Sequence, residues 1–355
     1  MQDTINCGIV GCGTIAPLHA ECLQKISDVR ITWACDLVTE KARSLGEKFS
    51  IEKITSDVRE LLQDPRLDAV HVCTDHASHA AISIAALEAG KHVLCEKALT
   101  AQPDALRSML EAGKKCPDQI FSGVFQHRFE PAMQYVQRLV DSENLGTLLT
   151  ASVQAYCLRT EDYYRSASWR GTWKDEGGGV LINQAIHFID CLNWIMGGVA
   201  SLSGAFSNRT HPSIEVEDTA VAALRFRNGC LGVIEASSST DHTLWSNVLS
   251  IQGSKGCIEV RNNKVTRAVF SDPALQAKVD LDLARLHEPP PTATGKGYYG
   301  PGHPAQIADF IDCIRTGRAP WVSASSAMST VELVHAIYAS ARRGCWMDLL
   351  SSPTP

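Results

Sequence analysis

The sequence has no excess of basic residues and no long apolar run. Lys and Arg number 33 against 39 Asp and Glu, and the net charge of −6 argues against nucleic acid or an anionic membrane as the main partner. No run of about 18 apolar residues predicts a membrane span. The chain also opens without the basic and apolar regions of a signal peptide. We therefore expect a cytoplasmic protein.

Cysteine is plentiful, but its pattern predicts neither a disulfide framework nor a zinc site. The 13 cysteines are odd in number, none forms a Cys-x-x-Cys pair, and several, such as Cys73, Cys95 and Cys191, lie in apolar runs. Free, mostly buried thiols in a reducing compartment fit this pattern better, and we predict no metal site. At 355 residues, with 45% hydrophobic and 20% charged residues, the chain suits two globular domains.

The first part of the chain alternates apolar runs typical of strands with segments typical of helices. Strands are expected at 5–10, 29–35, 69–73, 91–96 and 120–125. Strands separated by helices pair in parallel, so we predict an α/β domain over residues 1–123. Residues 124–355 form a second domain, in which alternating strands predict a mostly antiparallel sheet.

A Gly-x-Gly-x-x-Ala motif follows the first strand and opens a helix. Gly11 permits the tight turn and Gly13 lets the backbone approach a pyrophosphate, which the helix N-terminus then meets with unpaired N–H groups. Asp36 ends the second strand, where its carboxylate would bind ribose hydroxyls and repel a 2′-phosphate. We therefore predict NAD, with NADP disfavoured; a glycine turn in another α/β fold is the alternative.

Further polar residues lie at the predicted carboxyl ends of strands, where ligands of open α/β sheets bind. An Asx-turn and helix cap would explain the run 74–79 equally well, and a solvated turn would explain the pair at 96–97. The candidate cofactor-binding residues are Gly11, Gly13, Thr14, Ile15, Asp36, Thr74, His76, His79, Glu96, Lys97 and Gln126.

The run 177–194 begins with three glycines and continues with apolar residues at three- and four-residue spacing. This spacing predicts a largely buried amphipathic helix. Asn183 and His187 are four residues apart and therefore share one face of it, with Asp190 close to the same face. Taken alone, the pattern fits either a core histidine or a functional pair.

Together these stretches resemble the Gfo/Idh/MocA family of oxidoreductases over nearly the whole chain. The matching residues are the runs 11–16, 89–98, 177–190, 217–220 and 253–256, together with Asp36. The resemblance implies a Rossmann domain, a C-terminal α/β domain with a mostly antiparallel open sheet, and an active site between them. It also implies nicotinamide chemistry on sugars or cyclitols, in a homodimer or homotetramer.

Two residues depart from the family's usual pattern. Ala98 follows Lys97 where the family usually has proline, so packing must place the lysine. Asn183 stands where the family usually has aspartate, and an amide cannot carry charge as a carboxylate does. This asparagine resembles the branch of the family that oxidises the 3-hydroxyl of free or nucleotide-linked pyranoses.

The resemblance implies hydride transfer between a secondary sugar hydroxyl and NAD, with Lys97, Asn183 and His187 as catalytic residues. His187 suits the base and Lys97 would stabilise the developing alkoxide, although the sequence also permits Lys97 as the base. An aromatic and cationic loop at 163–173 is expected to bind the sugar, unless its tryptophans only anchor the loop. The candidate substrate residues are Arg128, Tyr156, Arg159, Tyr164, Trp169 and Arg170.

Three classes of function remain open from the sequence. A sugar or cyclitol dehydrogenase, with an inositol or a nucleotide sugar as alternative substrates, fits all the motifs. A glycosidase or lyase that oxidises C3 only transiently is the second class. The third is a nucleotide-binding sensor without catalysis, against which the presence of both Lys97 and His187 counts. The loop 282–301, rich in proline and glycine, is a lid, a dimer contact or a plain connection.

Overall fold

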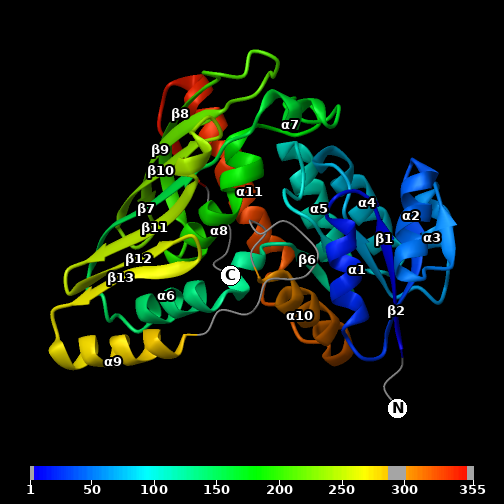
Figure 1. Ribbon diagram of the computed structural model, residues 1–355, viewed down its shortest axis with the longest axis horizontal. Coiled ribbons are helices and arrows are strands. Elements are labelled where there is room, and N and C mark those ends of the chain that lie inside the picture. Colours follow the sequence, from blue (N-terminus) through cyan, green and yellow to red (C-terminus); the bar gives the residue numbers. More distant parts are fainter. Residues whose placement is uncertain (1–3, 287–300, 350–355) are drawn as a thin grey trace. The chain divides into compact units, whose positions relative to one another are not determined.

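The computed structural model describes residues 4–286 and 301–349, which form two compact units (Figure 1). The first unit contains residues 4–126 and 301–328, and the second contains 127–286 and 329–349. A segment from near the end of the chain therefore packs with the first unit. The loop 282–301, which is predicted to be a lid, a dimer contact or a plain connection, lies mostly outside the described residues.

The first unit is built on a six-stranded sheet in the order β3-β2-β1-β4-β5-β6, in which every adjacent pair is parallel. The strands are β1 Ile5–Val10, β2 Val29–Cys35, β3 Lys53–Thr55, β4 Ala69–Val72, β5 His92–Cys95 and β6 Phe121–Gly123. The helices are α1 Ala16–Gln24, α2 Thr39–Phe49, α3 Val58–Leu62, α4 His76–Glu88, α5 Pro103–Lys115 and α10 His303–Thr316. This arrangement confirms the predicted Rossmann sheet.

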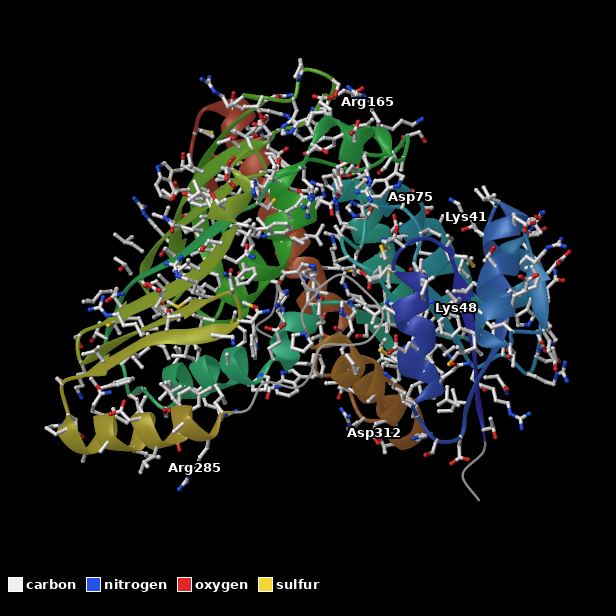
Figure 2. All side chains as sticks on the ribbon, in the orientation of Figure 1. Lys41, Lys48, Asp75, Arg165, Arg285 and Asp312 are labelled. Atoms are coloured by element: carbon white, nitrogen blue, oxygen red, sulfur yellow. The ribbon has the colours of Figure 1, made fainter. Side chains whose placement is uncertain are left out.

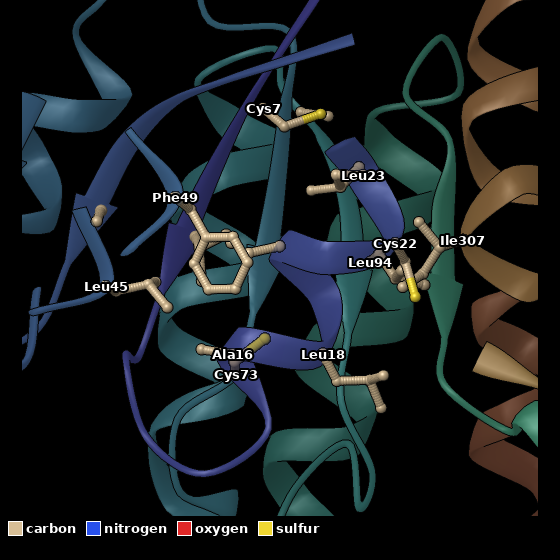
Figure 3. Packing of buried hydrophobic residues seen from close by; sticks show 14 of the residues in the cluster. Cys7, Ala16, Leu18, Cys22, Leu23, Leu45, Phe49, Cys73, Leu94 and Ile307 are labelled. Carbon is tan, nitrogen blue, oxygen red and sulfur yellow. The ribbon is translucent and has the colours of Figure 1, made fainter. Parts of the chain in front are cut away.

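The core of the first unit joins this sheet to α1 and to α10. Cys22 of α1, Leu94 of β5 and Ile307 of α10 are buried in one cluster (Figure 3). Burying such side chains is the main favourable contribution to folding. Helix α10, far from the other elements in sequence, is therefore an integral part of the unit.

A side-chain cap explains where α4 begins. Asp75, which is labelled in Figure 2, follows β4. Its carboxylate accepts a hydrogen bond from the backbone N–H of Ser78 at 3.1 Å. Such a bond satisfies one of the N–H groups that have no partner inside the helix. The Asx-cap interpretation of the run 74–79 is thus confirmed for Asp75.

The second unit is built on an eight-stranded sheet in the order β13-β12-β11-β7-β10-β9-β8-β14. Its pairs are antiparallel except β7–β10, so the predicted mostly antiparallel sheet is confirmed. The strands are β7 Leu148–Tyr156, β8 Val199–Ser207, β9 Thr219–Phe226, β10 Leu231–Ser237, β11 Ser246–Gly253, β12 Gly256–Arg261, β13 Lys264–Phe270 and β14 Met347–Asp348.

Helices pack on one face of this sheet, where α8 contacts β7 and β11, and α6 contacts β12. Along β9, buried and exposed residues alternate, so the opposite face is open to solvent. The helices of this unit are α6 Pro131–Asp141, α7 Glu161–Arg165, α8 Ile186–Ile195, α9 Pro273–Arg285 and most of α11 Ala324–Arg343. A short 3₁₀ turn, Gln126–Phe129, joins the two units in sequence.

Several elements differ from the sequence prediction, among them the short strand β3, which the prediction does not contain. The helix predicted after the glycine triplet begins with a π-helical turn, Leu181–Ala185, and continues as α8. We call residues 181–195 the site helix. Helix α9 lies where the sequence predicts no helix, because only Val279 of it is buried and no apolar stripe marks it. In the described part of the chain, no helix has the length and apolar character needed to cross a membrane.

Candidate functional site

The glycine loop of the first unit is tightly packed at Gly11 and open at Gly13. Gly11 has a positive φ of 88°, and a Cβ there would lie 2.6 Å from the carbonyl carbon of Cys73. A side chain at position 11 is therefore excluded. A Cβ at Gly13 would meet no atom within 4 Å, and Thr14 next to it is exposed, so this side of the loop is open to a ligand. Ile15 is the N-cap residue of α1.

Asp36 is fixed against this loop. Its Oδ2 accepts a hydrogen bond from the N–H of Cys12 at 2.8 Å, and its Oδ1 accepts one from Val38 at 2.8 Å. The half-buried carboxylate therefore stands at the end of β2 beside the glycine loop. This placement fits the predicted contact with an adenosine ribose.

Of the residues predicted at positions 74–79, Thr74 is partly exposed and the two histidines are buried. Thr74 is half-buried, and its hydroxyl accepts a hydrogen bond from Ser78 at 2.7 Å. His76 and His79 are buried and their rings are 5.9 Å apart. His79 contacts two backbone carbonyls, that of Ala98 through Nδ1 at 2.7 Å and that of Thr74 through Nε2 at 3.2 Å. Its imidazole thus holds two loops together.

Glu96 and Lys97, the pair predicted at the end of β5, also differ in burial. Lys97 is half-buried, whereas Glu96 is buried and its Oε2 accepts the backbone N–H of Lys97 at 3.1 Å. The ligand atoms of Glu96, His19 and His303 all lie within 4.8 Å of one another, which is a geometry that could hold a metal ion. Gln126 is buried, and its carbonyl leaves no room for a side chain at position 302.

In the second unit, a buried carboxylate holds the beginning of the site helix. Glu217 accepts hydrogen bonds from the N–H of Gly179 at 2.8 Å, the N–H of Leu181 at 3.0 Å and the hydroxyl of Tyr338 at 2.8 Å. A Cβ at Gly179 would lie 1.9 Å from the carbonyl oxygen of Glu217, so only glycine fits. Burial raises the pKa of Glu217 to about 7.

The site helix is buried almost all round, and its partly exposed side chains gather on one face. Between residues 181 and 190 these are Asn183, Gln184 and His187. Asn183 and His187 are one turn apart, and the π-helical turn lies directly before α8. Such turns are frequent at functional sites. His187 is therefore partly exposed, unlike a histidine sealed in a core.

Tyr163 connects this face to the predicted sugar-binding loop. Its hydroxyl oxygen lies 3.2 Å from the side-chain nitrogens of both Asn183 and Gln184, and it also contacts the guanidinium of Arg170. The guanidinium of Arg170 lies 4.2 Å from the ring centre of Tyr163 and 4.5 Å from that of Trp169. The buried carboxylate of Glu176 also contacts the amide of Asn183.

Arg128 is committed to the core of the second unit. It donates from Nε and Nη2 to the two carboxylate oxygens of Asp190, at 2.7 and 2.6 Å, and both side chains are buried. Thr330 donates to the same carboxylate at 2.8 Å. A buried bidentate pair of this kind would be costly to break, so the geometry does not support Arg128 as a substrate contact.

The other predicted substrate residues have different surroundings. The hydroxyl of buried Tyr164 lies 3.3 Å from that of Ser238, and burial raises the pKa of Tyr164. Tyr156 alternates with buried Ala155 in β7, and burial together with Glu235 raises its pKa to about 12. This places Tyr156 on the open face of the sheet, away from α8. Arg159 is half-buried over the rings of Tyr163 and Trp245, at 4.9 and 5.2 Å.

Several residues of the site have no strong signal in the sequence. Tyr163 precedes Tyr164, and only the short helix α7 decides which of the two hydroxyls reaches the site helix. Glu176 is one acid in a polar stretch before the glycines. His19 is a single histidine in the apolar helix α1. A titratable residue among apolar neighbours is unusual, and this feature of the sequence could have indicated His19.

Comparison with known proteins connects both units to one group of enzymes. Residues 5–124 match the family model described as "Oxidoreductase family, NAD-binding Rossmann fold" (GFO_IDH_MocA). Residues 137–349 match the one described as "Oxidoreductase family, C-terminal alpha/beta domain". Together the two matches cover most of the chain.

Individual relatives act on sugars and cyclitols. Myo-inositol 2-dehydrogenase from Thermotoga maritima is 31% identical over 75% of this chain and 78% of its own. D-glucoside 3-dehydrogenase from Escherichia coli is 26% identical over 66% of this chain and 71% of its own. The structure of the WlbA dehydrogenase from Bordetella pertussis, in complex with NADH and UDP-GlcNAcA, superimposes with a TM-score of 0.86 at 26% identity, covering 98% of this chain and 100% of its own.

The placement of Asp36 predicts how a substitution there changes cofactor preference. The variant Asp36→Asn keeps an acceptor for Cys12 but loses the charge, so NAD binding should weaken about tenfold. NADP binding should improve relative to NAD, because the repulsion of a 2′-phosphate is removed. Titration calorimetry with both nucleotides measures the ratio. Glu40→Gln, at an exposed position of α2, is the control; an unchanged ratio in Asp36→Asn would contradict the assignment.

The contacts of Glu217 predict the effect of an amide at that position. In Glu217→Gln an NH₂ group faces the N–H of Gly179 or Leu181, so the free energy of unfolding should fall by about 1–3 kcal/mol. The pKa of Glu217 is raised from 4.5 to about 7 by burial, so the native state retains a proton that the unfolded chain releases. Wild-type stability should therefore decrease as the pH rises through this window.

Urea denaturation between pH 4.5 and 7 measures the free energy of unfolding of the wild type and of Glu217→Gln. The variant should be less stable, and it should lack the part of the pH dependence that titration of Glu217 causes. The control is Glu143→Gln, at an exposed position in the same unit. Equal stability and equal slopes in the variant and the wild type would show that Glu217 does not hold the helix.

Proposed function

Because this chain belongs to the Gfo/Idh/MocA family of oxidoreductases and uses NAD to act on a CH–OH group of sugars or cyclitols, we propose that it oxidises the 3-hydroxyl of a pyranoside. The observation that carries this proposal is the accessible face of the site helix, where Asn183 and His187 lie next to an aromatic and cationic loop. A relative named D-glucoside 3-dehydrogenase supports the choice of carbon.

In the proposed reaction, the residues of the chain control the proton and the orientation of the sugar. NAD, when bound, supplies the hydride acceptor. His187 accepts the proton of the reacting hydroxyl, and Lys97 donates a hydrogen bond to the same oxygen as negative charge develops on it. Asn183 orients the sugar by hydrogen bonding, since its amide is fixed by Tyr163 and Glu176.

The loop 163–173 supplies the proposed sugar contacts. Trp169 presents an aromatic ring, which suits the apolar C–H face of a pyranose, and Arg170 presents N–H donors for hydroxyls or an acidic substituent. Arg159 would extend this donor surface beside Tyr163. The buried side chain of Tyr164 would hold the loop in place through its contact with Ser238.

A panel of sugars tests the proposed substrate. Pyranosides with a free equatorial 3-hydroxyl should reduce NAD, and the matching 3-deoxy pyranosides should not, because they lack the reacting group. The measurement is absorbance of NADH, with inositols and nucleotide sugars in the same panel. Cleavage of a glycoside without net formation of NADH would instead indicate an enzyme that oxidises C3 only transiently. Activity confined to inositols would contradict the proposal that the substrate is a pyranoside.

Replacement of the proposed base tests the mechanism. His187→Ala should lower kcat by about 10²–10⁴-fold, because the hydroxyl proton then has no acceptor of suitable strength. NAD affinity, measured by fluorescence titration, should remain that of the wild type. His242→Gln, at an exposed position of the same unit, is the control. A near-normal kcat in His187→Ala would remove His187 from the chemistry.

The open face of the second sheet supports the proposal that the enzyme forms homo-oligomers. Four apolar side chains on this face are exposed by 46–55%: Val221, Leu231, Val233 and Val269. Val221 and Val233 belong to the paired strands β9 and β10, so they contribute to one continuous surface. Self-association through a two-fold axis would bury the same surface on both copies.

Charges placed on this face should therefore reduce the oligomer. Leu231→Glu combined with Val233→Glu should shift the molar mass from light scattering to that of a single chain, because carboxylates cannot be buried against their own copies. Leu281→Glu changes an equally exposed apolar residue on α9 and should leave the mass unchanged. An unaltered mass in the double variant would place the interface elsewhere.

A further inference from the structure

The carboxylate of Glu96 is buried among histidines rather than basic side chains. Its Oε1 lies 2.9 Å from Nε2 of His19 and 3.7 Å from Nε2 of His303. Within residues 4–286 and 301–349, no Lys or Arg forms an ion pair with it. Burial alone would raise the pKa of Glu96, but the two imidazoles hold it well below its usual range. The group is therefore a carboxylate that depends on these neighbours.

The hydrogen bonds around His19 have one preferred direction. Its Nδ1 lies 2.9 Å from Nδ1 of His71, so one of the two nitrogens must donate. Burial lowers the pKa of His71 well below its usual value, so His71 is neutral. Its Nε2 has no partner among the described residues, so a proton there would be an unsatisfied buried donor. His71 therefore donates through Nδ1 to His19, and His19 donates through Nε2 to Glu96.

These bonds end at the backbone of Lys97. The second oxygen of Glu96 accepts the N–H of Lys97 at 3.1 Å. On the other side of the lysine, the carbonyl of Ala98 contacts Nδ1 of His79 at 2.7 Å. Glu96 and Ala98 are both buried, whereas Lys97 is half-buried. The backbone on both sides of the lysine is thus held from inside the unit.

His19 and His303 come from different parts of the chain. His19 lies in the first turns of α1, directly after the glycine loop, and His303 is the first residue of α10. Their rings are 6.2 Å apart. The carboxylate of Glu96 therefore links the helix of the glycine loop, the end of β5 and the start of α10 at one point.

We propose that His19 is a positioning residue of the reaction, with the imidazole of His303 beside it: His19 fixes the carboxylate of Glu96, which in turn fixes the backbone of Lys97 and the position of its ammonium group. Neither imidazole has to touch the sugar. The 2.9 Å separation of His19 from Glu96 is a hydrogen-bond length, so these groups satisfy one another without an ion. This inference rests on the proposed role of Lys97.

The test compares two variants at position 19. His19→Leu removes the donor to Glu96, so kcat should fall about tenfold to a hundredfold as the ammonium loses its position, while KM for the sugar stays close to that of the wild type. His19→Gln keeps an N–H donor and should recover most of the lost kcat. Hydrogen exchange measured by mass spectrometry should show faster exchange at the amide of Lys97 in His19→Leu than in His19→Gln.

A matched control separates positioning from general destabilisation. His92 lies at the opposite end of β5, and its Nδ1 accepts the backbone N–H of Ile120 at 2.9 Å. His92→Leu removes one imidazole contact from the same strand, so it should lower the melting temperature without changing kcat or the exchange at Lys97. Loss of kcat in His92→Leu equal to that in His19→Leu would overturn the proposal.

Further outcomes separate this inference from the proposed function. If Lys97→Met is inactive while His19→Leu has the kcat and the amide exchange of the wild type, the positioning role fails and the function stands. If Lys97→Met has normal turnover, the role of Lys97 fails first. If metal analysis of the purified protein finds one zinc ion per chain, and His19→Leu and His303→Leu both lose it, a metal site replaces the proposed hydrogen bonds.

Discussion

The site helix begins where two segments of backbone touch with no room for a side chain between them. Gly179 lies against the carbonyl of Glu217, and the carboxylate of the same glutamate accepts the N–H groups of Gly179 and Leu181. This contact fixes where the helix starts, and the helical repeat then fixes where Asn183 and His187 emerge. The exposed face of the helix therefore depends on a group that is itself fully buried.

Both units bury ionisable groups, and in both units these groups have polar partners. Glu96 is surrounded by imidazoles, Asp190 is paired with Arg128, and Glu217 is surrounded by N–H and O–H donors. A buried charge without such partners would cost several kcal/mol. Because each partner comes from a distant part of the chain, these groups also fix the relative positions of helices and strands within each unit.

The proposed site differs from the sequence expectation mainly in which polar residues make buried contacts within the protein and are therefore not available to a substrate. Asn183 stands where the family usually has aspartate, and the carboxylate of Glu176 lies directly against its amide. Arg128 and Tyr164 were expected at the sugar, and both are buried in contacts within their own unit. Tyr163, next to Tyr164, has the hydroxyl that reaches the site helix. Short polar segments leave such choices open, since neighbouring side chains point in different directions.

The sequence by itself determined the parallel and antiparallel sheets, the glycine loop with Asp36 after the second strand, and the placement of Asn183 and His187 on one helix, because these depend on local periodicity and on glycine. Only the tertiary structure decided that α10 completes the first unit, that His19 and His303 meet at Glu96, and that Glu217 holds the site helix. These contacts join residues far apart in the chain, and no local pattern encodes them. Their partners are selected by burial, which only the folded chain defines.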